Sequence, residues 1–114
     1  MAPIILVGGF LAPRTRGSAS SHQQLYWGSA LDRDYKLCGA VTALAPSSVA
    51  SLHDRATELF YLIKGGRVDF GEAHSWEFGH ERFGRTVERG AHEAWSEEQP
   101  VHLVGHSFGG STIR

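Results

Sequence analysis

The sequence contains a single cysteine and no excess of charge of either sign. Cys38 excludes an intramolecular disulfide and any zinc site built from several cysteines. Eleven lysines and arginines stand against twelve aspartates and glutamates, which leaves no basic surface for a phosphate backbone or an anionic membrane. We therefore expect no nucleic acid partner.

The chain also lacks a long apolar segment. The longest nearly uncharged stretch, residues 1–13, contains Pro3 and the pair Gly8-Gly9 and is too short to span a bilayer. We predict no transmembrane segment. The same stretch has neither the basic start nor the cleavage site of a secretory signal, so the sequence leaves the cellular location open.

What is present is typical of one small globular domain. The 114 residues are 41% apolar and 20% charged, and no internal repeat or linker divides them, so we treat residues 1–114 as one domain. Seven histidines stand out. A bound metal would therefore have imidazole and carboxylate ligands.

Three short apolar segments predict strands, and one periodic segment predicts a helix. Residues 3–7, 40–44 and 101–104 have the length and composition of buried strands. Residues 51–64 carry apolar side chains at helical spacing: Leu52, Ala56, Leu59, Phe60 and Ile63. Ser51 and Asp54 resemble a capping box. The order of strand, helix and strand favours an α/β fold with a parallel sheet and crossover helices.

The segment 65–98 is polar, glycine-dotted and without sustained periodicity. We interpret it as a long loop with short helical pieces, and loops of that length usually serve a function.

The predicted last strand runs into the pattern G-x-S-x-G, formed by Gly105, Ser107 and Gly109 with two residues between them. This pattern is typical of a nucleophile elbow, whose glycines allow a sharp turn from strand to helix. Ser107 would then be the nucleophile, and the backbone amide of Phe108 could face a developing oxyanion. The alternative is an ordinary glycine-rich turn between a strand and a helix.

Five sequence blocks follow one another in a characteristic order: residues 3–11, 26–28, 68–74, 79–86 and 101–114. In this order they resemble the secreted bacterial lipases of the staphylococcal and thermophilic Bacillus type. The block 79–86, GHERFGRT, is more specific than the elbow because general α/β-hydrolases lack it. The resemblance implies a partial α/β-hydrolase fold, truncated after the elbow, in which residues 65–98 form a zinc-type loop insertion.

The resemblance also implies a structural zinc ion. It places three ligands in this chain, Asp54, His74 and His80, and a fourth beyond its end. Oxygen and imidazole ligands suit zinc independently of the resemblance. Because His74 and His80 lie six residues apart, they would occupy different faces of a helix, so we expect them to converge from a loop. Without a metal, Asp54 would be a helix cap; Asp69 is an alternative carboxylate.

The same resemblance assigns Ser107 as the acyl-accepting nucleophile and the amides of Phe10 and Phe108 as the oxyanion hole. Two departures are visible. The family usually has His-Gly-Phe where this chain has Gly8-Gly9-Phe10, and Gln or Met where it has Phe108. Backbone amides can tolerate both changes.

Only seven residues follow Ser107, and none is Asp, Glu or His. Since α/β-hydrolases supply the acid and the histidine of the triad downstream of the serine, we expect the chain to be the N-terminal part of a single hydrolase domain, about a third of a lipase. A sheet of about three strands would leave an open edge, so the isolated chain should fold poorly or self-associate.

The sequence thus predicts a carboxylic-ester hydrolase of the triacylglycerol lipase type that acts in lipid metabolism on a lipid or ester substrate. The chain as given lacks two triad members, so whether it is itself an enzyme stays open. One alternative is a non-catalytic hydrolase remnant that binds a metal or a partner. A thioesterase or acyltransferase is less favoured, because the zinc block weighs against it.

Overall fold

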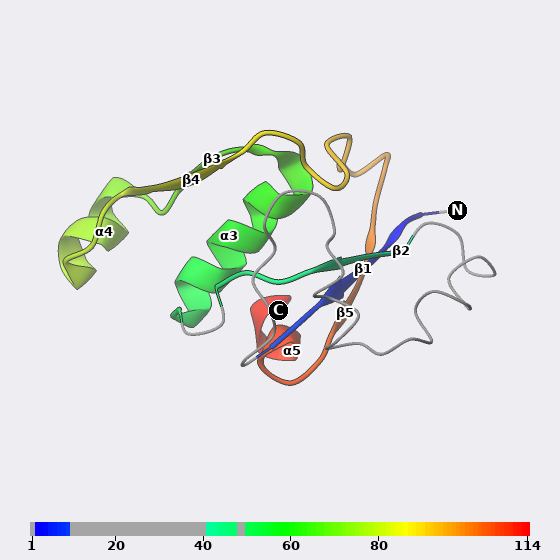
Figure 1. Cartoon of the computed structure of the whole chain (residues 1–114), viewed down its shortest axis with the longest axis horizontal. Helices are drawn as coiled ribbons and strands as arrows, with labels where there is room; N and C mark the ends of the chain where they lie inside the picture. The colour runs from blue at the N-terminus through cyan, green and yellow to red at the C-terminus, as the bar shows by residue number, and fades with distance from the viewer. Residues whose placement is uncertain (1, 10–40, 48–49) are drawn as a thin grey trace.

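The structure is a computed structural model that describes residues 2–9, 41–47 and 50–114. These ranges contain five strands and three helices (Figure 1). Their order is β1 (Ile4–Val7), β2 (Val41–Leu44), α3 (Leu52–Lys64), β3 (Gly66–Asp69), α4 (Glu72–Phe78), β4 (Phe83–Val87), β5 (His102–Gly105) and α5 (Phe108–Thr112).

The main sheet has three parallel strands in the order β2-β1-β5. Ile4 of β1 aligns with Val41 on one side and with His102 on the other. Ile5 and Val7 of the central strand are fully buried and form the centre of the core. The three predicted strands and their parallel pairing are confirmed. The central strand is β1, with β2 on one side and β5 on the other.

Helix α3 begins and ends where the sequence predicts. The Ser51 hydroxyl accepts a hydrogen bond from the amide of Asp54 at 3.2 Å, which satisfies one free amide of the first turn. At the other end Gly65 adopts φ 82°, a conformation that favours glycine, and its amide donates to the Tyr61 carbonyl.

The buried face of α3 differs from the expected one. The helix buries Leu59, Leu62 and Ile63, but also the charged residues Arg55 and Glu58. By contrast, three apolar residues of the expected face, Leu52, Ala56 and Phe60, are exposed. The apolar pattern did not predict the burial of Arg55 and Glu58, because both are charged. They lie one helical turn before the buried Leu59 and Leu62 and so share their face of the helix.

The segment 65–98 is more regular than expected. Strands β3 and β4 form an antiparallel pair, with α4 between them, and together they extend away from the three-stranded sheet (Figure 1). Helix α4 agrees with the expectation of a short helical piece, whereas the two strands correct the prediction of a loop. Gly84 shows why: a Cβ there would lie 3.1 Å from the Phe70 ring and 3.2 Å from Val68 Cβ. Close packing, rather than loop character, explains this glycine.

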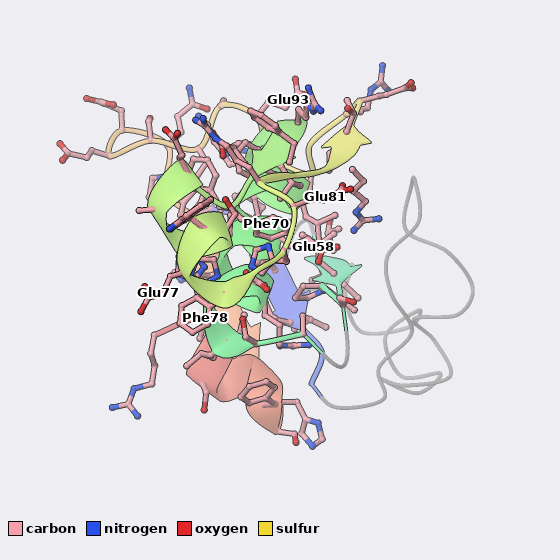
Figure 2. The ribbon with its side chains drawn as sticks, turned by 90° about the vertical axis from the view of Figure 1, so that its left-hand side faces the viewer. Glu58, Phe70, Glu77, Phe78, Glu81 and Glu93 are labelled. Atoms are coloured by element: carbon pink, nitrogen blue, oxygen red, sulfur yellow. The ribbon has the colours of Figure 1, made fainter. Side chains whose placement is uncertain are left out.

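Helix α3 joins the two sheets. It contacts β3 directly, and its buried residues form one core cluster with Ile5 and Val7 of β1. Helix α4 lies at the far end of the molecule, where Figure 2 shows Glu77 extending outward from it. No helix in the part of the chain that the structure describes is long and apolar enough to cross a membrane.

Candidate functional site: a strained serine turn and a histidine–aspartate cluster

Ser107 occupies the turn between β5 and α5 in a strained conformation. Its dihedral angles are φ 58° and ψ −128°, and among the described residues no other non-glycine residue has a positive φ. Such a backbone conformation costs about 1–3 kcal/mol and is found mostly at functional sites. The side chain of Ser107 is exposed.

Two glycines allow this turn. A Cβ on Gly109 would lie 2.2 Å from the Val7 carbonyl oxygen, and a Cβ on Gly105 would lie 2.5 Å from the backbone of Gly109. Both separations are far below van der Waals contact, so neither position accepts a side chain without movement of the backbone. The spacing of the two glycines in the sequence therefore has a steric cause.

The loop after β1 packs directly against the serine turn. A Cβ on Gly9 would lie 2.7 Å from the amide nitrogen of Phe108, which brings the backbone of Gly9 next to that amide. The amide of His106 donates to the Val7 carbonyl at 3.1 Å, which ties the turn to β1. Phe10, expected to supply the second oxyanion amide, lies outside the described residues.

The three expected metal ligands come together at the start of α3. Asp54 Oδ1 lies 3.0 Å from His74 Nε2 and 3.5 Å from His80 Nε2. Asp54 is in the first turn of α3, His74 is in α4, and His80 follows that helix. The cluster therefore links the β3–β4 insertion to α3.

The way in which the two histidines meet corrects our expectation. His74 lies within a helix rather than a loop. Helix α4 ends at Gly79, whose left-handed conformation (φ 67°) reverses the chain, and the amide of His80 donates back to the Ser75 carbonyl at 3.2 Å. As a result the ring centres of His74 and His80 are 5.0 Å apart.

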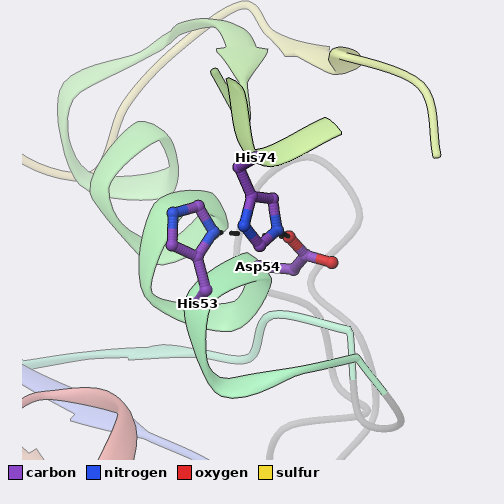
Figure 3. A group of neighbouring side chains, drawn as sticks. All are labelled: His53, Asp54 and His74. Carbon is purple, nitrogen blue, oxygen red and sulfur yellow. Dashed lines mark hydrogen bonds and ion pairs between the residues drawn. The ribbon is translucent and has the colours of Figure 1, made fainter. Parts of the chain in front are cut away.

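His53 is a member of the cluster that the sequence analysis missed. Its ring stacks on that of His74 with a centre separation of 3.6 Å, and its Nδ1 lies 3.5 Å from Asp54 Oδ1 (Figure 3). One ligand atom from each of His53, Asp54 and His74 can be chosen so that all lie within 4.8 Å of one another. One feature of the sequence could have indicated His53: it lies next to Asp54, a predicted ligand, in the first turn of a predicted helix.

The histidines lower the pKa of the Asp54 carboxyl. Burial raises the pKa of Asp54, but the hydrogen bonds with His74 and His53, the charge of His80 and the contact with Ser51 outweigh it, so the net pKa is below its ordinary value. An ionised carboxylate among imidazoles is a suitable donor set for a divalent metal.

Asp69, the alternative carboxylate, is engaged elsewhere. Its Oδ1 accepts hydrogen bonds from Arg82 Nε at 3.0 Å and from the Gly71 amide at 2.9 Å. The bond from Arg82 is the main reason that the pKa of Asp69 is lowered, and the same pair raises the pKa of Arg82. Asp69 thus stabilises the turn after β3.

Two separations measured from Asp54 are close to those between the ligand atoms of a metal ion. Tetrahedral zinc with bonds of about 2.0–2.1 Å places its ligand atoms about 3.3 Å apart, and the separations from Asp54 Oδ1 are 3.0 and 3.5 Å. His80 Nε2 is buried and has no hydrogen-bond partner within the described ranges. A buried ring nitrogen that lies near a carboxylate without a hydrogen bond to any described residue is the arrangement expected of a metal ligand.

A parallel α/β sheet that ends in a strained, exposed serine is typical of a lipase-like domain. Residues 1–114 match the model of the protein family described as "Lipase-like, C-terminal domain", and the chain belongs to this family. The family is described as a C-terminal domain, so the chain corresponds to the C-terminal part of these lipases rather than to the N-terminal part that the sequence analysis expected.

Lipases are also the relatives that sequence and structure comparisons find. The lipase of Staphylococcus hyicus is 43% identical over 116 residues, covering 98% of this chain and 18% of the relative. Its crystal structure matches with a TM-score of 0.81, covering 99% of this chain and 30% of the solved one. The structure of EstA from Clostridium botulinum also matches with a TM-score of 0.81, at 42% identity, covering 98% of this chain and 26% of EstA. The chain therefore spans less than a fifth of the curated relative's length.

Proposed function

We propose that this chain is part of a carboxylic-ester hydrolase of the triacylglycerol lipase type, with Ser107 as its nucleophile. The observation that carries the proposal is the conformation of Ser107, at φ 58° on a turn between strand and helix where Gly105 and Gly109 admit no side chain. These features are those of a nucleophile elbow. The homology to lipases supports the same reaction class.

In this reaction Ser107 Oγ attacks the ester carbonyl carbon while a general base takes its proton. The carbonyl oxygen becomes an oxyanion, which the amides of Phe108 and Phe10 stabilise by hydrogen bonds. The tetrahedral intermediate collapses to an acyl-enzyme and releases the alcohol, which takes up the proton. Water then attacks the acyl-enzyme, releases the carboxylic acid and restores Ser107.

The general base and its acid partner belong, on this proposal, to a part of the lipase outside residues 1–114. The chain spans 18% of the Staphylococcus hyicus lipase and 30% of its solved structure, which leaves room for both. We propose that the chain is the N-terminal part of a single α/β-hydrolase domain, with residues 65–98 as an insertion. This proposal agrees with the family match if the hydrolase domain itself lies in the C-terminal part of a longer lipase.

Asp54, His74 and His80 are proposed as three ligands of a structural zinc ion. The ion would hold the first turn of α3 to α4 and to the residue after it, and so anchor the insertion to the core. The buried Nε2 of His80 and the ionised carboxylate of Asp54 support this donor set. A structural ion of this kind stabilises the fold and takes no part in ester cleavage.

The cluster also favours a second candidate function. Its candidate ligands do not include Ser107, so a non-catalytic metal-binding remnant would keep the same geometry. The two candidates differ in whether the complete protein hydrolyses esters at all.

The test uses the product of the complete open reading frame that carries this sequence. Reading that frame beyond the codon for Arg114 should reveal an acid and a histidine in lipase-like context. Ser107→Ala should then abolish hydrolysis of a short-chain nitrophenyl ester. Ser111→Ala, an exposed serine of α5, is the matched control and should keep full activity. Retained activity in Ser107→Ala would refute the assignment. A reading frame without that acid and histidine, together with no hydrolysis by the unchanged protein, would favour the remnant.

A further inference from the structure

Arg55 is the most deeply buried charged residue among those described, with no exposed surface. Its guanidinium donates hydrogen bonds from Nε to Thr112 Oγ1 at 3.0 Å, from Nη1 to the Ser47 carbonyl at 2.9 Å, and from Nη2 to the Gly8 carbonyl at 2.6 Å. Burial of a charge is costly unless it is hydrogen-bonded, so these contacts must be kept for the core to form.

The partners of Arg55 come from three elements around Ser107. Gly8 lies directly after β1, Ser47 lies shortly after β2, and Thr112 belongs to α5. The carboxyl ends of neighbouring parallel strands meet at the same edge of the sheet, which is where ligands bind in α/β folds. Arg55 therefore spans the edge at which the serine turn lies.

On the α5 side Arg55 controls the position of Phe108. The hydroxyl of Thr112, which accepts from Arg55, also donates to the Phe108 carbonyl at 2.9 Å. The guanidinium carbon lies 5.0 Å from the centre of the Phe108 ring, in the range of a cation–π contact. Two independent contacts thus connect Arg55 to the residue whose amide is the proposed oxyanion donor.

On the β1 side Arg55 contacts the loop that precedes Phe10, the second proposed oxyanion donor. The Gly8 carbonyl belongs to the peptide that joins Gly8 to Gly9, and the hydrogen bond from Arg55 fixes the plane of that peptide. Gly9 in turn packs against the amide nitrogen of Phe108. A rotation of this peptide would therefore disturb both halves of the hole.

We propose that Arg55 is the positioning residue of the oxyanion hole. It holds the Gly8–Gly9 peptide and Phe108 in a fixed relative position without touching the substrate. This inference rests on the proposed ester hydrolase function. Only arginine can fill the role, because its planar fork presents donors in three directions, whereas a lysine ammonium is a compact point charge.

The experiment compares Arg55→Lys with the unchanged protein, both made from the complete open reading frame. The kcat is measured with a nitrophenyl ester and divided by the concentration of reactive serine, which is titrated with a fluorophosphonate in a separate aliquot. We expect kcat to fall about 100-fold, as for other small misplacements of catalytic groups, and KM to change by less than about threefold. A boronic acid, whose adduct carries the oxyanion, should bind more weakly by a similar factor.

The matched control is Arg67→Lys, since Arg67 also lies over an aromatic ring, that of Phe83 at 4.2 Å, but is exposed on β3. It should leave kcat and KM unchanged. A purely structural role of Arg55 would lower the amount of titratable serine but not kcat per serine. A kcat per titrated serine within about threefold of the unchanged protein would overturn the proposal.

A second variant decides the matter if Arg55→Lys does not fold. Thr112→Val keeps the shape of the side chain but removes the acceptor of Arg55 Nε and the donor to Phe108. It should lower kcat about tenfold with KM unchanged, and an unchanged kcat would overturn the proposal. If Ser107→Ala keeps its activity, the proposed function itself fails, and this result is distinct from a failure of Arg55 alone.

Discussion

Asp54 and Arg55 are consecutive residues in the first turn of α3, yet their side chains serve two different sites. Asp54 Oδ1 lies 3.0 Å from His74 Nε2, whereas Arg55 Nη2 donates to the Gly8 carbonyl at 2.6 Å. Successive residues of a helix point about 100° apart, so neighbours can face opposite partners. One turn of helix therefore connects the histidine cluster to the turn that carries Ser107.

The glycines of α5 provide a matched pair for testing the packing of the serine turn. Gly109→Ala should destabilise the protein by about 3 kcal/mol, because its Cβ would overlap the Val7 carbonyl. The nearest atom to a Cβ on Gly110 is 3.8 Å away, so Gly110→Ala should be neutral or stabilise by about 0.5–1 kcal/mol. Urea unfolding measures both, and equal effects of the two changes would contradict the packing described here.

The composition of the metal site can be tested by zinc binding. His80→Ala should weaken the affinity for zinc by more than about 100-fold. Loss of a group that only hydrogen-bonds to a metal ligand already costs about 10–100-fold. His53→Ala should weaken it by less than about tenfold, because His53 stacks on His74 and is half exposed. Competition with a chromogenic chelator gives both affinities.

His102→Ala, at an exposed position of β5, serves as the control for the loss of a histidine. The reverse order of effects, with a large loss in His53→Ala and none in His80→Ala, would mean that His53, Asp54 and His74 hold the ion instead.

The Asp69–Arg82 pair predicts a pH dependence of stability. Because its folded pKa lies below the ordinary value of 3.8, Asp69 contributes stability that is present above that pH and is lost as the pH falls through the folded pKa. Arg82→Gln should raise the pKa of Asp69 toward 3.8, as measured by carbon NMR of the carboxyl group. Glu81→Gln is the neighbouring control and should leave that pKa in place.

The 114-residue chain on its own should self-associate. Within the described ranges β2 and β5 each have a neighbour on one side only, and Leu52, Phe60 and Val104 are exposed. Open strand edges and uncovered apolar side chains favour association. Light scattering after gel filtration measures the mass. A monomer with a cooperative thermal transition would show this expectation to be wrong.

Local patterns were sufficient to predict the three strands of the main sheet, helix α3 and the turn at Ser107. The apolar segments that became β1, β2 and β5 are short and bounded by glycine or proline, and Ser51 and Gly65 mark the ends of α3. The glycines on either side of Ser107 follow from sterics that operate within a few residues. Such signals are readable because they depend on near neighbours in the chain.

The β3–β4 pair and the faces of α3 could not be read in this way. β3 buries only Val68 fully, so the alternation that marks a strand is almost absent. Arg55 and Glu58 are buried because partners distant in sequence satisfy them: Arg55 donates to Gly8, and Glu58 lies 3.0 Å from Arg85. No window of the sequence contains that information.

The sequence by itself determined the residue types that the chemistry needs: a serine between permissive glycines, and histidines with an aspartate for a metal. Only the tertiary structure decided their arrangement. The reversal at Gly79 turned His80 back to His74, the first turn of α3 brought Asp54 and His53 to them, and the burial of Arg55 tied that turn to the serine. The physical reason is that hydrogen bonds and ring contacts form between atoms close in space, whatever their separation along the chain.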